Sequence, residues 1–287
     1  HLHRLRNCRL LCEWALNELP GTPEAEKARL MLAAVAPAEQ TAAASLAAAQ
    51  EKRPPRPDRL PAFRIEKVTR EQGADPEFAC HLRVAHASLT EALPLEVRAR
   101  IPANVPVCRA AVLNMDMGGY GIYWNRAWIE ECRRIQCAMI HLAGDFIGKK
   151  AMHFAGRDGG PLLTEALRAI AKEAQRPELP NLPWVPWGLS GGGYAADEMR
   201  ECSPERLLGC IPYHGESGFW GHGPFAEPTD AALEVPMLLF VGGGDMGCGK
   251  ESMLMRFLKE RAHGGLAVHV REPGVGHVAN GPVPFQG

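Results

Sequence analysis

The sequence of 287 residues lacks the features that mark several classes of protein. No run of about 18 apolar residues occurs, so no membrane-spanning helix is expected. The stretch that comes nearest, Leu30 to Ala49, is interrupted by Pro37, Glu39 and Gln40. Neither sign of charge is in excess, because the formal net charge is only −1. Nucleic acid and anionic membranes are therefore not expected as partners on electrostatic grounds.

Metal-binding and redox signals are also missing. The nine cysteines include no C-x-x-C pair, and the eleven histidines include no H-E-x-x-H pair. Zinc and thioredoxin-type sites therefore have no support in the sequence. An odd number of cysteines in a chain of this length favours buried thiols, with one or two disulfides in an exported protein as the alternative.

The chain begins at His1 rather than at a methionine, and it stops ten residues after His277. We therefore expect it to be a fragment whose final helix is missing. Localisation stays open between cytoplasmic and exported, because a signal peptide would lie outside the sequence.

The sequence divides into two regions with different patterns of apolar and polar residues. Residues 1–52 read as three helices, one before the Pro20–Gly21 break, one capped by Thr22 with Pro23 in its first turn, and one from about Pro37 to Lys52. The prolines and charges of residues 53–58 predict a linker. We therefore expect a helical extension with its linker at 1–58 and a second domain at 59–287.

The second region predicts an α/β fold. Alternating apolar and polar residues indicate half-buried strands at 63–69, 78–87 and 95–102. Strands and helices then alternate, with strands near 109–114, 137–144, 184–187, 207–213, 235–241 and 266–270 and helices near 124–134 and 161–175. Such alternation is typical of a doubly wound, mostly parallel sheet, here preceded by antiparallel strands.

A nucleophile-elbow pattern, G-x-S-x-G, spans Gly188, Ser190 and Gly192. A serine on a sharp strand-to-helix turn is exposed only if the residues two places before and after it carry no side chain that would collide. The pentapeptide alone is a weak signal, since Gly and Ser are common in turns. The order of the residues that follow it strengthens the signal.

An acid and a histidine follow the elbow in order. The apolar run 235–241 ends in a glycine-rich loop with Asp245, and the strand 266–270 leads to a second glycine-rich loop with His277. In these motifs the chain resembles the α/β-hydrolase family, most closely its esterase branch of dienelactone-hydrolase and polyester-depolymerase relatives. The resemblance implies that Ser190 is the nucleophile, His277 the general base and Asp245 the residue that orients it.

The resemblance also implies an oxyanion hole. One backbone N–H donor is expected from Gly191 and the other from Gly118 or Gly119, on the loop after the strand at 109–114. Met115 and Asp116 stand where the family has the histidine of a His-Gly-Gly motif. The backbone donors do not need that side chain. An ordinary glycine turn after a strand is the alternative interpretation.

Two other patterns compete for the same region. Gly244 to Lys250 matches the phosphate-binding pattern G-x-x-x-x-G-K, but Glu251 stands where that loop needs Ser or Thr for magnesium. Glu216 follows the preceding strand, where some hydrolases carry the acid, and it is the alternative to Asp245. The sequence thus predicts hydrolysis of a small or polymeric ester without a metal or organic cofactor. The alternatives are a peptidase or other acyl-transfer enzyme, or a nucleotide-binding protein.

Overall fold

The computed structural model describes residues 8–9, 12–13, 15–51, 62–85, 92–115, 121–143, 159–215, 228–245 and 250–277. None of the helices in these ranges is long and apolar enough to cross a membrane.

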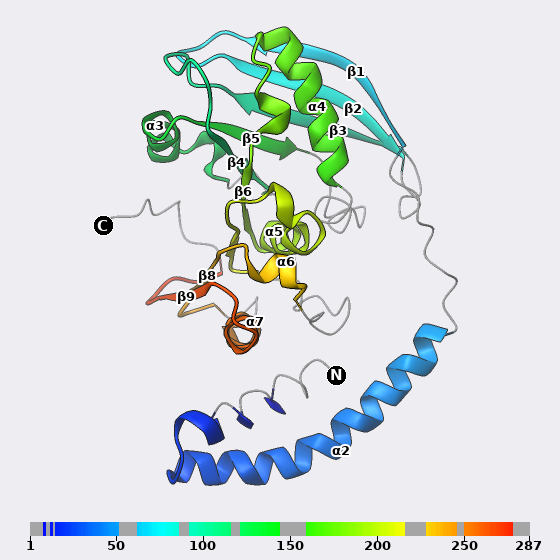
Figure 1. Ribbon diagram of the computed structural model, residues 1–287, viewed down its shortest axis with the longest axis vertical. Helices are drawn as coiled ribbons and strands as arrows, with labels where there is room; N and C mark the ends of the chain where they lie inside the picture. Colours follow the sequence, from blue (N-terminus) through cyan, green and yellow to red (C-terminus); the bar gives the residue numbers. More distant parts are fainter. Residues whose placement is uncertain are drawn as a thin grey trace.

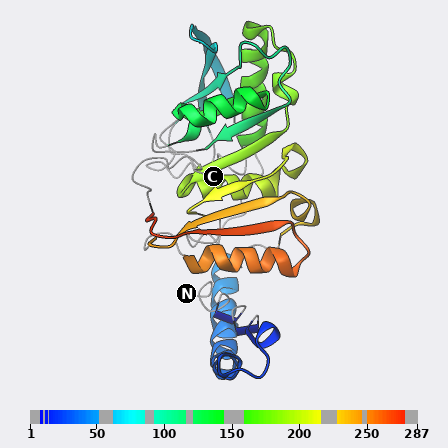
Figure 2. The same ribbon diagram turned by 90° about the vertical axis from the view of Figure 1, so that its left-hand side faces the viewer.

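A nine-stranded sheet forms the centre of the molecule, in the order β1-β2-β3-β5-β4-β6-β7-β8-β9. Figure 1 shows this order from top to bottom, and Figure 2 shows the sheet after a quarter turn. The strands are β1 (Ala62–Glu71), β2 (Glu77–Ala85), β3 (Leu93–Arg100), β4 (Ala110–Asn114), β5 (Cys137–Ala143), β6 (Trp184–Leu189), β7 (Ile211–Tyr213), β8 (Met237–Gly242) and β9 (Ala267–Glu272).

The first part of the sheet is antiparallel and the rest is parallel. β1, β2, β3 and β5 pair antiparallel in that order, and every pair from β5 to β9 is parallel. β4 is buried along its whole length, because it is apolar on both faces and helices cover both sides of a doubly wound sheet. The architecture predicted from the sequence, antiparallel strands followed by a mostly parallel sheet, is confirmed.

Helices pack on both faces of the sheet. α4 (Gly159–Ala174), α5 (Gly191–Cys202) and α7 (Lys250–Ala262) lie on one face, and α3 (Arg126–Arg134) lies on the other with the short helix η1 (Ile122–Trp124). Three shorter elements, η3 (Leu179–Asn181), η4 (Pro204–Arg206) and α6 (Asp230–Leu233), complete the fold. The predicted apolar side of α4 is buried against the sheet, with Leu162, Leu163, Ala166, Leu167 and Ile170 in the main core.

Several predicted boundaries differ from the observed ones, and two of the differences have a local cause. The strand expected at 207–213 is reduced to β7, because Leu207 forms an isolated bridge to Trp184 of β6 whereas Cys210 bridges to Met237 of β8. The chain bends at Leu208, between the two bridges, and this bend interrupts the strand. The helix expected from Trp124 begins instead at Arg126, where the Asn125 side chain accepts hydrogen bonds from two backbone N–H groups of the first turn.

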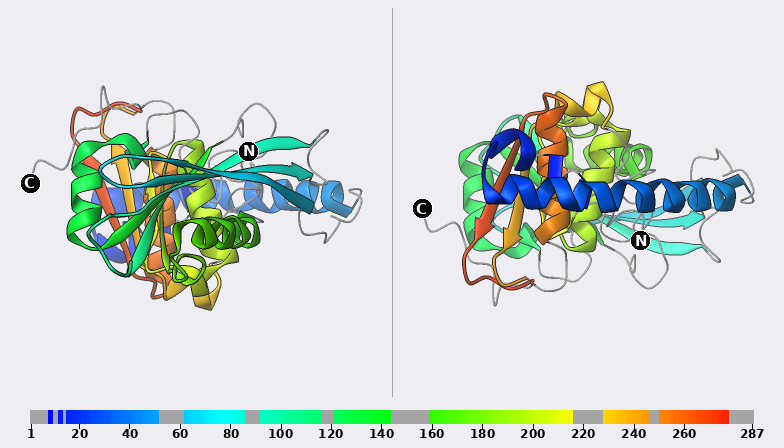
Figure 3. Two further views of the ribbon diagram at one scale, coloured as in Figure 1. Left: turned by 90° about the horizontal axis from the view of Figure 1, so that it is seen from above. Right: turned by 90° about the horizontal axis from the view of Figure 1, so that it is seen from below.

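The N-terminal helices also differ from the prediction. The two helices expected on either side of Pro37 are one continuous helix, α2 (Pro23–Glu51). Thr22 caps it as predicted, since its Oγ1 accepts from the Ala25 N–H at 3.2 Å. Proline costs about 3 kcal/mol inside a helix, but alanine, the strongest helix former, is abundant on both sides of it. The view from below in Figure 3 (right) shows α2 running across the side of the molecule that faces the viewer.

A buried ion network joins α5 to α7 away from the carboxyl ends of the strands. Arg200 donates to both carboxylate oxygens of Glu260, at 2.9 and 2.8 Å, and both side chains are fully buried. Arg256 donates to Asp197 at 3.0 Å and to Glu201 at 2.5 Å. Burial opposes the charge of Arg256, but the surrounding carboxylates raise its pKa above the ordinary value. The network therefore joins two helices of the same layer through paired charges.

Candidate active site

The elbow places Ser190 between the end of β6 and the start of α5. Its backbone is strained, with φ 55° and ψ −115°. The Ser190 N–H donates to the Tyr213 carbonyl of β7 at 2.9 Å, and this hydrogen bond fixes the turn to the neighbouring strand. A Cβ atom at Gly188 would lie 2.2 Å from the Gly192 carbonyl carbon. Gly188 is therefore required by the close approach of the two sides of the turn.

The end of β7 comes equally close to the elbow. A Cβ atom at Gly215 would lie 2.1 Å from the Ser190 carbonyl oxygen. Any other residue at this place would force either the serine or the β7 loop to move. This contact was not predicted, because nothing in the linear sequence relates residue 215 to residue 190.

The structure brings Ser190, His277 and Asp245 together. His277 Nε2 lies 3.0 Å from Ser190 Oγ, and His277 Nδ1 lies 3.0 Å from Asp245 Oδ2. The three residues follow β6, β9 and β8, at the carboxyl ends where parallel sheets place functional groups. The Asp245 side chain is fully buried, whereas 28% of the His277 side chain is exposed. A histidine between a carboxylate and a hydroxyl in this way can take the hydroxyl proton.

Backbone hydrogen bonds join the loops that carry the acid and the histidine. The Gly243 N–H donates to the Glu272 carbonyl at 2.7 Å, and the Gly244 N–H donates to the Val275 carbonyl at 2.8 Å. These bonds continue the parallel pairing of β8 and β9 beyond the ends of the strands. The glycine-rich loops before Asp245 and His277 are thus joined to each other by main-chain hydrogen bonds.

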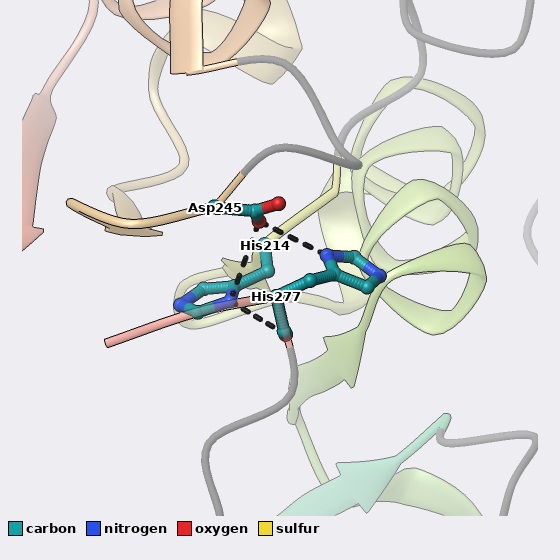
Figure 4. A group of neighbouring side chains, drawn as sticks. All are labelled: His214, Asp245 and His277. Carbon is teal, nitrogen blue, oxygen red and sulfur yellow. Dashed lines mark hydrogen bonds and ion pairs between the residues drawn. The ribbon is translucent and has the colours of Figure 1, made fainter. Parts of the chain in front are cut away.

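A second histidine, His214, belongs to the same cluster. Its side chain is fully buried, and its Nδ1 lies 2.8 Å from the His277 carbonyl oxygen and 3.6 Å from Asp245 Oδ2 (Figure 4). No functional role was predicted for His214 from the sequence. Its position directly after a strand of the parallel sheet, like that of Asp245 and His277, was the available signal.

The cluster could also be considered as a metal site. Among the described residues, His214, Asp245 and His277 have possible ligand atoms within 4.8 Å of one another. However, both Nδ1 atoms point at oxygen acceptors at hydrogen-bonding distance, 2.8 Å for His214 and 3.0 Å for His277. Such nitrogens carry a hydrogen, whereas a nitrogen that binds a metal must be bare. Hydrogen bonding therefore accounts for the arrangement.

The predicted oxyanion donors are only partly within the described residues. Gly191 is the first residue of α5, so its N–H is one of those at a helix start that have no partner within the helix. Gly118 and Gly119 lie outside the described residues. The chain enters their loop from β4 at Met115, whose N–H donates to the Trp187 carbonyl of β6 at 2.8 Å.

A buried polar pair lies where this loop leaves the sheet. His141 Nδ1 lies 2.8 Å from the side-chain nitrogen of Asn114 and 3.3 Å from the main-chain carbonyl oxygen of Asn114. Burial lowers the pKa of His141 to about 4, although the Asn114 carbonyl opposes the shift and Arg98 adds to it. His141 is therefore neutral at neutral pH.

The competing patterns are described only in part. Glu216 and residues 246–249 of the phosphate-loop pattern lie outside the described residues. At the two ends of that pattern, Asp245 contacts His277, and Lys250 begins α7. Of the described cysteines, Cys12, Cys80, Cys108, Cys132, Cys137 and Cys210 are buried thiols, as expected, whereas Cys202 is exposed.

Comparison with known proteins finds likeness only at the level of structure. No protein-family model matches the sequence, and no curated protein matches it either. Est1E from Butyrivibrio proteoclasticus is 12% identical, with a TM-score of 0.43, over 70% of this chain and 91% of that chain. Poly(aspartic acid) hydrolase-1 from Sphingomonas sp. KT-1 is 16% identical, with a TM-score of 0.46, over 65% and 89%. An acetyl xylan esterase from Aspergillus awamori is 11% identical, with a TM-score of 0.47, over 64% and 89%.

The chain has an α/β-hydrolase fold. This statement depends on the strand order, in which β4 and β5 exchange places before a parallel run to β9, and on the serine turn between β6 and α5. The likeness to the three solved structures says nothing about activity, because one fold supports many chemistries. Activity must be argued from the site.

Proposed function

We propose that the protein is a serine hydrolase that cleaves carboxylic esters through an acyl-enzyme on Ser190. The observation that carries the proposal is the hydrogen-bonded series from Ser190 Oγ through His277 to Asp245, with both links at 3.0 Å. The series begins at a strained serine that faces the start of a helix. Few structural roles need a buried carboxylate, an imidazole and a hydroxyl in this order.

In the first half of the reaction Ser190 Oγ attacks the ester carbonyl carbon, and its proton passes to His277 Nε2. Asp245 accepts the hydrogen bond of Nδ1–H, which fixes the tautomer and stabilises the imidazolium. The backbone N–H of Gly191, with a second donor that we assign to Gly118 or Gly119, stabilises the negative oxygen. His277 then gives its proton to the departing alcohol, and the acyl group remains on Ser190.

Water completes the cycle. His277 Nε2 takes a proton from water as the water oxygen attacks the acyl carbon. Collapse of this second intermediate returns the proton to Ser190 Oγ and releases the carboxylic acid. Every step uses groups of this chain and water, so the proposal includes no cofactor.

Replacement of Ser190 by Ala tests the proposal. We expect hydrolysis of a p-nitrophenyl ester to fall by at least about 10⁴-fold and labelling by a fluorophosphonate probe to disappear. In the wild-type protein, peptide mapping should place the label on Ser190. Full activity of Ser190→Ala, or a label on another residue, would refute it. A panel of matched esters and peptides distinguishes an esterase from a peptidase, and stabilisation by ATP would instead support nucleotide binding.

A further inference from the structure

His214 occupies an unusual backbone position at the end of β7. Its φ angle is 52°, in the left-handed region that residues other than glycine and asparagine rarely adopt. Its N–H donates to the Phe240 carbonyl of β8 at 2.9 Å, so the main chain is fixed there by the sheet. This conformation turns the side chain inward, where none of it is exposed.

Both ring nitrogens of His214 face oxygen acceptors. Nδ1 lies 2.8 Å from the His277 carbonyl oxygen, which can only accept a hydrogen bond, so Nδ1 is the donor. The same nitrogen lies 3.6 Å from Asp245 Oδ2, and Nε2 lies 3.3 Å from Glu272 Oε2. Figure 4 shows the His214 ring below Asp245 and to the left of the His277 ring, with dashed lines to the Asp245 carboxylate and to the His277 main chain.

Neighbouring groups hold the ring in place. The Tyr213 ring stacks on it, with ring centres 4.2 Å apart and planes inclined by 5°. Because one side chain fixed in this way contacts both the acid and the main chain of the histidine, its loss would affect the relative positions of the two. A fully buried imidazole with these contacts contributes more than packing.

We propose that His214 is a positioning residue, which holds His277 at hydrogen-bonding distance from Ser190 by binding the His277 carbonyl oxygen. The inference rests on the proposed function, since it concerns the geometry of the same three residues. His277 reaches Ser190 from a loop, and catalysis depends steeply on such geometry: a misplacement of about 1 Å can cost about 100-fold in rate. His214 does not touch the reacting atoms and acts only through His277 and Asp245.

The variants His214→Gly and His214→Asn separate this role from general packing. Glycine adopts the left-handed backbone without strain but supplies no donor. Asparagine also tolerates that backbone, and its side-chain nitrogen is as many bonds from Cβ as Nδ1 of histidine. We expect kcat for a p-nitrophenyl ester to fall about 10- to 100-fold in His214→Gly with KM little changed. In His214→Asn we expect kcat within about threefold of the wild type.

The rate of fluorophosphonate labelling should follow kcat, because it reports the same Ser190–His277 contact. His269→Asn is the matched control: this histidine lies on β9 and packs near Phe257, with ring centres 5.9 Å apart, and its replacement should leave kcat unchanged. Near-ultraviolet circular dichroism confirms that each variant is folded. If His214→Gly does not fold, His214→Ala replaces it, since alanine also supplies no side-chain donor and adds no charge beside Asp245 and Glu272.

The outcomes decide between the two proposals. Wild-type kcat in His214→Gly, or equal losses in the Gly and Asn variants, would overturn the role of His214 even if Ser190→Ala is inactive. Activity in Ser190→Ala would instead overturn the proposed function. A loss in the Gly or Ala variant that Asn restores, at constant KM, supports the positioning role.

Discussion

The carbonyl oxygen of Ser190 and the α-carbon of Gly215 are in such close contact that a Cβ atom at residue 215 would lie 2.1 Å from that oxygen. The neighbouring Tyr213 carbonyl accepts the Ser190 N–H at 2.9 Å, and His214 between them contacts Asp245 and His277. Residues 213–215 therefore contact all three members of the candidate triad. The end of β7 supports the site, although none of these residues takes part in the proposed chemistry.

We expect Gly215→Ala to destabilise the protein by about 3 kcal/mol and to reduce esterase activity by more than tenfold, because the new methyl group must displace the serine backbone. The free energy of unfolding can be measured by urea denaturation and the activity with a p-nitrophenyl ester. Gly209→Ala is the control, since its Cβ would be 3.4 Å from the Pro236 carbonyl oxygen, an ordinary contact. Equal behaviour of the two variants would contradict the prediction.

The strained backbone of Ser190 predicts a trade-off between stability and activity. Glycine at residue 190 relieves the strain of φ 55°, whereas alanine retains it. Both variants lack the hydroxyl and should be inactive, but Ser190→Gly should be more stable than Ser190→Ala by about 1 kcal/mol. Thermal unfolding of the two proteins measures the difference. If the alanine variant is equally stable or more so, the backbone at this position is not strained.

The role of the acid can be tested with Asp245→Asn. The asparagine amide can donate to His277 Nδ1, which moves the ring hydrogen to Nε2 and prevents that nitrogen from accepting the serine proton. We expect kcat to fall by about 10³- to 10⁴-fold with the fold intact. Glu216→Gln is the matched control, because Glu216 is the other acid that the sequence offers. If Glu216→Gln is inactive and Asp245→Asn is not, the assignment of the acid is reversed.

Most of the fold could be predicted because local patterns decide it. β3 alternates between inward and outward residues, and β4 is apolar up to its last residue, Asn114, so each shows its environment in its own sequence. Local sequence patterns gave wrong predictions where contacts with residues outside the segment decide the structure. Leu207 and Cys210 bridge to different strands, and Pro37 remains inside α2 despite its usual preference.

The residues of the candidate site also divide into those that local patterns reveal and those that only contacts between distant segments reveal. Ser190, Asp245 and His277 could be chosen because each lies on a glycine-rich turn after an apolar strand, and the sequence order of the three is informative. Their catalytic roles stay predictions. Gly215 and His214 were missed because their significance comes from contacts among the ends of β6, β7, β8 and β9, between residues at least 25 positions apart (215 − 190). Such contacts have no periodicity.

The buried pair of Arg200 and Glu260 predicts a large stability effect remote from the site. Glu260→Gln removes the charge that neutralises Arg200 and also faces Arg256, at 3.2 Å, so two buried cations lose a partner. We expect a loss of about 3–5 kcal/mol in the free energy of unfolding. Glu130→Gln, in an exposed pair with Arg126 on α3, should cost less than about 0.5 kcal/mol. Similar urea midpoints for the two variants would contradict this prediction.

His141 predicts how stability depends on pH. Its pKa is about 4 in the folded protein and near 6.5 when exposed, so between these values the unfolded chain binds more protons and is favoured as the pH falls. The stability that depends on a neutral His141 is complete above about pH 6.5 and decreases as the pH falls to about 4. Each pH unit in this interval corresponds to about 1.4 kcal/mol, so about 2 kcal/mol should be lost by pH 5.

The variant His141→Gln isolates this contribution, because glutamine does not titrate and every other group is retained. It should be less stable than the wild type at pH 7.5, where the fitted contacts of the histidine with Asn114 are lost. The difference between the two proteins should then shrink by about 2 kcal/mol at pH 5, as the wild type alone incurs the cost of keeping a histidine neutral. Urea unfolding at both pH values measures it. A difference that is the same at pH 7.5 and pH 5 would show that His141 titrates normally in the folded protein.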